Sequence, residues 1–389
     1  MIQSARTDHA RSPAAPRPSP FMLTRRDAGS AARCGRLKTA HGTIDTPTFM
    51  PVATQGTVKG VLPAQLVETG AQIVLSNAYH LSLRPGIDVV EAIGGLHRFM
   101  GWDGAILTDS GGYQVMSLAA LRSITDEGVA FQSHLDGARL FLTPEAVVEG
   151  QVRLGVDILM PLDECVAHSS DPSVVSAALR RTTAWAERSA RVAVGADRHL
   201  FGIVQGGLDA ALRRTHAEQL AAIEFPGYAV GGLSVGEERG VTREMAAVTA
   251  AALPLDRPRY LMGVGLPQDL LRFIAMGYDL FDCVLPTRNG RNGTCFTWQG
   301  RVNLRLARHA RDPEPIDSDC PCPVCRQFSR AYLRHLHGAG EMLGAQLATL
   351  HNLHFYLDLM RQARARIAAG DYADWASARA DAIDDGERA

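Results

Sequence analysis

Short apolar runs recur along this chain and are separated by segments of helical character. Most of these runs are continuously apolar, which is typical of parallel strands buried on both faces. We predict eight strands: Pro47–Ala53, Ile73–Tyr79, Ala105–Asp109, Ile158–Asp163, Leu200–Gln205, Ala229–Leu233, Tyr260–Val264 and Leu280–Leu285. Eight strands that alternate with helices favour a (β/α)8 TIM barrel, an α/β fold, with a doubly wound open sheet as the alternative.

Prolines mark where the intervening helices begin, because proline is well tolerated in the first helical turn. The predicted starts are Leu62-Pro63, Thr143-Pro144, Asp171-Pro172 and Leu266-Pro267. Gly70 and Gly277 are expected to end the first and the last of these helices. No Gly-x-Gly-x-x-Gly follows the first strand, so a dinucleotide-binding sheet lacks support.

Polar side chains stand at the C-terminal ends of the predicted strands, where (β/α)8 barrels carry their chemistry. Asp109 and Asp282 suit a reaction at the acetal-like C1′ of a sugar, one attacking the carbon and the other handling the leaving group's proton. Asp163 and Gln205 suit the polar edge of a planar heterocycle, and Tyr113 offers a ring to stack on it. The simpler alternative is structural, since an Asp before a glycine turn is often only a turn former.

A metal motif lies near the C-terminus. Cys320-Pro-Cys322-Pro-Val-Cys325 is followed by His351. Three thiolates and one imidazole complete a tetrahedral set for zinc, and a site whose four positions are all filled by protein is structural. One zinc per chain is therefore expected.

These patterns divide the chain into four parts. Residues 1–20 are rich in Ala, Pro, Ser and Arg and predict a disordered tail. Residues 21–287 are expected to form the barrel, and residues 288–367 a zinc-binding subdomain with closing helices. Residues 368–389 are expected to form a C-terminal tail, and its last dozen residues are expected to be loose.

The net charge and the distribution of charge along the chain limit the nucleic-acid partners that the protein can have. The net charge of −1 argues against a protein that coats nucleic acid without specificity. Between Val284 and Arg366, however, the chain has twelve arginines, no lysine and six acidic residues. Such an excess indicates either a phosphate-facing side or a solvated helical surface.

The cellular location of the protein is predicted from features that the sequence lacks. No run of eighteen apolar residues occurs and no secretory signal is recognisable at the N-terminus, so no membrane association is expected. Four cysteines outside the metal motif show no pairing pattern, which favours a reducing, cytoplasmic setting. They are Cys34, Cys165, Cys283 and Cys295.

Several short motifs, in their order and spacing, resemble those of tRNA-guanine transglycosylase. They are Asp109-Ser-Gly-Gly-Tyr-Gln, Asp163-Glu-Cys165, Gln205-Gly-Gly, Tyr228-Ala-Val-Gly-Gly-Leu-Ser-Val-Gly-Glu237, Tyr260-Leu-Met-Gly-Val-Gly, Phe281-Asp-Cys-Val-Leu-Pro-Thr-Arg288 and the Cys-x-Cys-x-x-Cys…His set. Each motif is weak alone, but the collinear match from about Phe21 to Ile367 is specific.

The resemblance implies exchange of guanine 34 in the tRNA anticodon for 7-aminomethyl-7-deazaguanine (preQ1), in queuosine biosynthesis. It implies that Asp282 is the nucleophile of a covalent glycosyl-enzyme intermediate and that Asp109 is the general acid/base. The family's base-binding residues fall on Asp163, Cys165, Gln205, Gly232 and Leu233, with Tyr113 and Met262 enclosing the purine. Arg288 and Arg291 lie where the family holds the nucleotides that flank the exchanged base, and the exchanged nucleotide would be flipped out of its loop. Cys165 and Val235 match the bacterial type, and the family implies a homodimer.

Two other functions stay open at this point. A catalytically silent homologue, serving as a binding subunit, would be expected to lose pocket residues, whereas this chain keeps Asp109, Asp163 and Asp282. A barrel glycosidase acting on free carbohydrate would need rim tryptophans for sugar stacking. Of the four tryptophans, only Trp102 lies near a predicted strand end.

Overall fold

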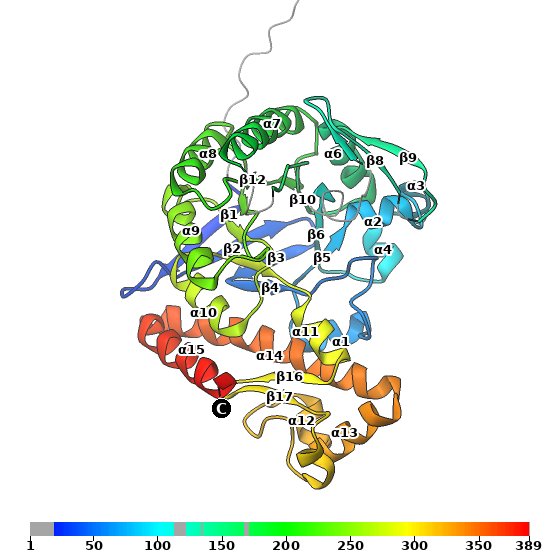
Figure 1. Cartoon of the computed structure of the whole chain (residues 1–389), viewed down its shortest axis with the longest axis vertical. Coiled ribbons are helices and arrows are strands. Elements are labelled where there is room, and N and C mark those ends of the chain that lie inside the picture. The colour runs from blue at the N-terminus through cyan, green and yellow to red at the C-terminus, as the bar shows by residue number, and fades with distance from the viewer. Residues whose placement is uncertain (1–18, 113–121, 134, 167–170, 389) are drawn as a thin grey trace, which may run out of the picture.

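A ring of parallel strands forms the centre of the molecule (Figure 1). The computed structural model describes residues 19–112, 122–133, 135–166 and 171–388. The strands of the ring are β4 (Thr48–Met50), β5 (Ile73–Asn77), β6 (Ala105–Asp109), β10 (Ile158–Leu159), β11 (His199–Leu200), β12 (Gly202–Val204), β13 (Tyr228–Val230), β14 (Arg259–Leu261) and β15 (Leu280–Asp282).

The ring is closed. β11 and β12 are separated only by Phe201, whose N–H donates to the Leu159 carbonyl on β10 at 3.0 Å, so together they act as one strand. β15 pairs with β4, and a parallel bridge between Val52 and Leu75 connects β4 to β5. The eight predicted strand positions are all occupied, the (β/α)8 barrel is confirmed, and the open doubly wound sheet is excluded.

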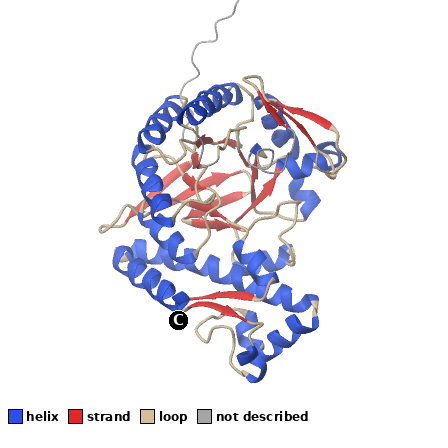
Figure 2. Cartoon of the chain, in the orientation of Figure 1, coloured by secondary structure: helices blue, strands red, loops and turns tan. Residues whose placement is uncertain are grey.

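Helices surround the ring on its outside (Figures 1 and 2). They are α1 (Pro63–Thr69), α2 (Ala78–Leu83), α3 (Ile87–Ala92), α4 (Leu96–Met100), α6 (Pro144–Leu154), α7 (Pro172–Ala190), α8 (Ala210–Ala222), α9 (Arg239–Ala252) and α10 (Pro267–Ala275). All four predicted starts are confirmed, with proline in the first turn. The Thr143 hydroxyl caps α6 by accepting from the Ala146 N–H at 3.1 Å, and Gly70 ends α1 at a φ of 86°.

Two three-stranded antiparallel sheets were not predicted. β1 (Phe21–Arg26), β2 (Arg33–Thr39) and β3 (Gly42–Thr46) form the first, and Phe21, Leu37 and Ile44 join the apolar cluster inside the barrel. Because β3 leads directly into β4, this sheet covers the N-terminal end of the ring. The second consists of β7 (Arg122–Ile124), β8 (Val129–Gln132) and β9 (Arg139–Leu142), which follow β6 along the chain.

The C-terminal part lies against one side of the barrel (Figure 1). It contains α11 (Leu285–Arg291), the hairpin β16 (Thr294–Thr297) and β17 (Gly300–Asn303), the 3₁₀ turn Ala307–Arg311, α12 (Pro323–Gln327), α13 (Arg330–Ala339), α14 (Met342–Ala369) and α15 (Tyr372–Arg388). α14 packs along α11, where the Asn352 amide donates to the Pro286 carbonyl at 2.9 Å. α11 therefore runs across the boundary that we predicted at residue 287.

The prediction of a C-terminal tail at residues 368–389, loose in its last dozen residues, is wrong, because α15 is a packed helix that contacts α10 and β17. Its buried side chains recur at helical spacing, and Tyr372, Ala376, Ala380 and Ile383 are at most 4 % exposed. An ion pair of 2.8 Å between Arg272 and Asp384 adds a polar contact to α10. Among the described residues, no helix is long and apolar enough to span a membrane.

Candidate active site and metal centre

A cavity of about 560 Å³ opens where the strands of the barrel end. Its walls are the residues that follow β6, β10, β12, β13, β14 and β15, as the barrel interpretation predicted. Nine predicted site residues line it: Asp109, Asp163, Cys165, Gln205, Gly232, Leu233, Met262, Asp282 and Arg288. The structure thus gathers into one cavity residues that are spread over 180 positions of the sequence.

Asp282, at the end of β15, is held by two donors from β14 and the loop after it. The Tyr260 hydroxyl donates to Asp282 Oδ1 at 2.6 Å, and the Gly263 N–H donates to the same oxygen at 2.7 Å. Burial raises the pKa of Asp282, and these two hydrogen bonds oppose the rise only in part. Both donors favour the ionised form and fix the direction of the carboxylate.

Asp109, at the end of β6, has the opposite surroundings. Its Oδ1 is shielded from solvent and has no hydrogen-bond partner among the described residues. Burial, followed by the negative charges of Asp282 and Asp163, raises its pKa well above the ordinary value, and a side-chain hydrogen bond with Asn77 opposes this only in part. The cavity therefore contains two buried carboxyls whose pKa values are both raised, but only Asp282 has two hydrogen-bond donors that favour its ionised form, whereas Asp109 favours a proton. Unequal surroundings of this kind suit two carboxyls to different roles in acid–base chemistry.

Asp163 and Gln205 form the polar floor of the cavity. The Gln205 amide donates to Asp163 Oδ2 at 2.7 Å, and both side chains are buried. Burial raises the pKa of Asp163 to about 6. The glycine pair after β13 makes room for this arrangement, since a Cβ on Gly231 or Gly232 would lie 2.6 or 2.4 Å from the Gln205 amide. Gln205 approaches these two positions so closely that each must be glycine, whether or not a ligand is bound in the cavity.

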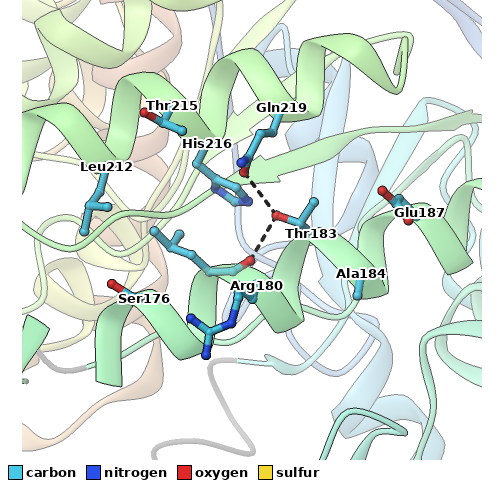
Figure 3. Close-up of a pocket in the computed structure, with 10 residues that line it drawn as sticks. Ser176, Arg180, Thr183, Ala184, Glu187, Leu212, Thr215, His216 and Gln219 are labelled. Carbon is cyan, nitrogen blue, oxygen red and sulfur yellow. Dashed lines mark hydrogen bonds between the residues drawn. The ribbon is translucent and has the colours of Figure 1, made fainter. Parts of the chain in front are cut away.

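Two residues of α8 support this floor and were not predicted from the sequence. Arg213 is fully buried and donates to the carbonyls of Gly207 at 2.7 Å and Gly231 at 3.2 Å. His216 accepts the Gln205 N–H on Nδ1 at 2.9 Å, and burial lowers its pKa to about 4, so its imidazole is neutral at pH 7. Figure 3 shows His216 pointing between α7 and α8. Polar residues three positions apart on the buried face of a helix were the signal available in the sequence.

The loop after β13 has its own fixed conformation. Ser234 has a φ of 61°, which is uncommon for a residue with a side chain. The Glu237 carboxylate holds this loop by accepting from the N–H groups of Ser234 and Val235 and, at 2.7 Å, from the Thr242 hydroxyl. Gly232, Leu233 and Val235 therefore line the cavity from a braced loop.

The remaining predicted residues differ in placement. Burial raises the pKa of Cys165 to about 12, so its side chain faces the cavity as a thiol. Arg288 lies at the exposed edge of the cavity, on α11. Arg291 lies one turn further, outside the cavity wall, and its Nη1 is buried without a hydrogen-bond partner among the described residues. Tyr113 lies outside the described residues.

The predicted metal ligands converge at a second place, between α12 and α14. The Sγ atoms of Cys320, Cys322 and Cys325 lie 3.8, 3.5 and 3.3 Å from His351 Nδ1. His351 Nε2 lies 2.9 Å from the Phe296 carbonyl, so that nitrogen carries the proton and Nδ1 is free to bind a metal. These separations fit a tetrahedral ion with metal–sulfur bonds of about 2.3 Å and a metal–nitrogen bond of about 2.0 Å.

Comparisons with known proteins agree with this geometry. The family model described as "Queuine tRNA-ribosyltransferase" matches residues 27–384. Relatives of that name include one from Solidesulfovibrio magneticus, 54 % identical over 91 % of this chain and 96 % of the relative, and one from Symbiobacterium thermophilum, 53 % identical over 92 % and 90 %. A third, from Aromatoleum aromaticum, is 54 % identical over 88 % and 93 %. The chain therefore belongs to the queuine tRNA-ribosyltransferase family, the tRNA-guanine transglycosylases that its motifs resemble.

Proposed function

We propose that this protein replaces guanine 34 of the tRNA anticodon with preQ1 by a double displacement. The observation that carries the proposal is the pair of carboxyls in one cavity: Asp282 accepts hydrogen bonds from Tyr260 and Gly263 that favour its ionised form, and Asp109 favours a proton. A nucleophilic carboxylate and a separate proton donor are the two groups that retaining chemistry at an anomeric carbon needs.

In the first half-reaction, the Asp282 carboxylate attacks C1′ of the nucleotide as the bond from C1′ to guanine breaks. The proton of Asp109 passes to the departing purine, which leaves as neutral guanine. Asp282 then carries the ribose as an ester, and Asp109 is left as a carboxylate.

In the second half-reaction, preQ1 occupies the place that guanine has left. The Asp109 carboxylate removes the proton from N9 of preQ1, N9 attacks C1′, and the Asp282–C1′ bond breaks. Both carboxyls return to their starting states, and two inversions at C1′ give net retention. No phosphodiester bond is broken.

The floor of the cavity suits a guanine-like base. Asp163 presents a carboxylate to the N–H groups of such a base, and Gln205 and the loop at Gly232 and Leu233 offer the complementary polar groups. Cys165 and Met262 line the same cavity as polarisable apolar contacts. We infer that guanine and preQ1, which share this polar edge, bind the same floor in turn.

The anticodon is proposed to lie over α11. Arg288 stands exposed at the cavity edge and Arg291 is partly exposed one turn further along α11, so we place both near the phosphates that flank the exchanged nucleotide. tRNA as the substrate also makes the cytoplasm the proposed location.

We propose that Cys320, Cys322, Cys325 and His351 hold a zinc ion. The ion would tie α12 to α14 and so fix the subdomain against α11, and it would take no part in the reaction because four protein ligands leave no open position. We further propose a homodimer through this region, where Met342 and Leu343 at the start of α14 are 80 % and 41 % exposed. Sedimentation velocity would test it, a purely monomeric species being the contrary result.

Incubation of the protein with unmodified tRNA and labelled guanine tests the reaction directly. Label at position 34 is expected, and preQ1 added in excess should chase it out. The absence of label from tRNA would exclude the proposed exchange. A glycosidase is disfavoured because none of the four tryptophans is among the residues that line the cavity, and Trp102, Trp185 and Trp298 are at most 8 % exposed.

A further inference from the structure

A second cluster of metal-binding side chains lies at the opposite end of the barrel from the active site. Asp157 directly precedes β10, so it lies at the N-terminal end of the ring. His41 lies in the turn between β2 and β3, and His97 lies in the first turn of α4. The ligand atoms of these three residues all lie within 4.8 Å of one another.

Both imidazoles direct a nitrogen at the same carboxylate. His41 Nδ1 lies 2.9 Å from Asp157 Oδ1, and His97 Nε2 lies 3.1 Å from Asp157 Oδ2. The two rings are stacked, with their centroids 3.5 Å apart and an angle of 16° between their planes. Three elements distant in sequence thus bring one imidazole nitrogen to each oxygen of a single carboxylate.

The carboxylate is a buried charge that lacks a permanent counter-charge. Asp157 is 1 % exposed, and its ion-pair partners among the described residues are the two histidines, with no arginine or lysine. Burial acts to raise the pKa of Asp157, but hydrogen bonds from His97, His41 and the Ile106 N–H outweigh it and hold the pKa below its ordinary value. A buried anion is normally paired with a cation or bound to a metal.

We propose that His41, His97 and Asp157 form a binding site for a divalent transition metal such as Ni²⁺ or Zn²⁺. Two imidazoles and a carboxylate are the donor set that such ions prefer, and Mg²⁺ or Ca²⁺ would instead require more oxygen ligands. The side chain of His41 is 36 % exposed and that of His97 is 13 % exposed, so water can reach the ion and complete its coordination.

The stacked rings must open slightly for both nitrogens to reach one ion, because parallel rings direct their lone pairs alongside each other. His41 has the freedom for this movement, since it lies in an exposed turn. The bound ion would link the β2–β3 hairpin to α4 and to the start of β10. Its effect would therefore be on the sheet that covers the N-terminal end of the barrel, without contact with the catalytic cavity.

The test is a titration of untagged, full-length protein whose cysteine site is already filled with Zn²⁺. Isothermal titration with Ni²⁺, with zinc and nickel counted separately by mass spectrometry, is expected to show one nickel bound per chain while zinc is retained. His41→Gln keeps a side chain that can hydrogen-bond Asp157 but offers no imidazole. It should weaken nickel binding by more than the roughly 10–100-fold that changes outside the direct ligands typically cause.

Two further variants complete the test. His97→Gln should weaken nickel binding like His41→Gln, whereas His335→Gln, which removes an exposed imidazole on α13, should leave it unchanged. Nickel should raise the melting temperature of the wild-type protein and of His335→Gln only. If the zinc-loaded protein binds no nickel, or if His41→Gln and His97→Gln bind it as tightly as the wild type, the cluster is a hydrogen-bonded clasp and the proposal is overturned.

Discussion

Asp163→Asn should stabilise the protein while it impairs base exchange. Asp163 is 7 % exposed, and burial raises its pKa to about 6, against about 3.9 in an unfolded chain. Because the folded state binds this proton more tightly, the ionised carboxylate destabilises the fold as pH rises through the window from about 4 to 6. The two pKa values of Asp163 differ by about two units, each worth about 1.4 kcal/mol. Ionisation of Asp163 therefore lowers the free energy of unfolding by roughly 3 kcal/mol at pH 8 and by roughly half of that at pH 5.

Asparagine has nearly the same shape, and its carbonyl oxygen can still accept from the Gln205 amide that donates to Asp163 at 2.7 Å. The variant should therefore exceed the wild type in unfolding free energy by up to roughly 3 kcal/mol at pH 8. With its oxygen held by Gln205, the asparagine directs an NH2 group, and no acceptor, toward the N–H groups of the base, so label incorporation into tRNA should fall.

Urea unfolding of zinc-loaded protein at pH 5, 6, 7 and 8 would measure the effect. Asp103→Asn, on an exposed residue, is the control for removing one negative charge and should give a small difference that does not depend on pH. If Asp163→Asn differed from the wild type equally at pH 5 and pH 8, or were the less stable protein at pH 8, the buried charge of Asp163 would not be the main cause of the difference in stability.

Three further substitutions test the assigned roles. Asp282→Asn should abolish a denaturation-resistant adduct with tRNA on a denaturing gel, and an undiminished adduct would exclude Asp282 as nucleophile. Asp109→Asn should lower exchange by at least about 100-fold with tRNA binding nearly unchanged in a filter assay, since general acid–base groups typically contribute 10²–10⁴-fold; exchange at the wild-type rate would remove its role. Cys322→Ala, combined with His41→Gln so that the second cluster does not supply zinc, should reduce bound zinc below one per chain and lower the melting temperature, whereas a full equivalent of zinc would contradict the ligand set.

The barrel could be predicted because its strands are buried on both faces. Continuous apolar runs such as Ala105–Asp109 leave little choice of structure, and that strand was predicted with its observed bounds. Other runs were predicted too long. Ile158–Asp163 contains a strand of only two residues, Ile158–Leu159, although the residues that follow it up to Asp163 are all buried. The apolar pattern records burial, and it does not record where hydrogen bonding to the neighbouring strand stops.

The β1–β3 sheet and α15 were not predicted from the sequence, for a different reason. β2 alternates buried and exposed positions over seven residues, with arginine and lysine on its outer face, so the apolar signal is only half as dense as in the ring. α15 buries Tyr372, Ala376, Ala380 and Ile383 against α10, yet two of these four are alanines, which carry little apolar weight in a sequence. Both elements are stabilised by a neighbour that the local sequence does not reveal.

The active site contains residues that line the cavity and residues that hold those cavity residues in place, and only the first kind could be predicted from the sequence. The strand-end carboxylates could be predicted because a barrel directs such positions to one face. Arg213 and His216 could not, since they act through the backbone of Gly231 and Gln205 from the helix outside the ring. The cavity floor is thus anchored from α8, and its geometry depends on buried hydrogen bonds that the binding motifs do not contain. A chain could therefore keep every strand-end residue of this family and still lose the position of Asp163, through one substitution on α8.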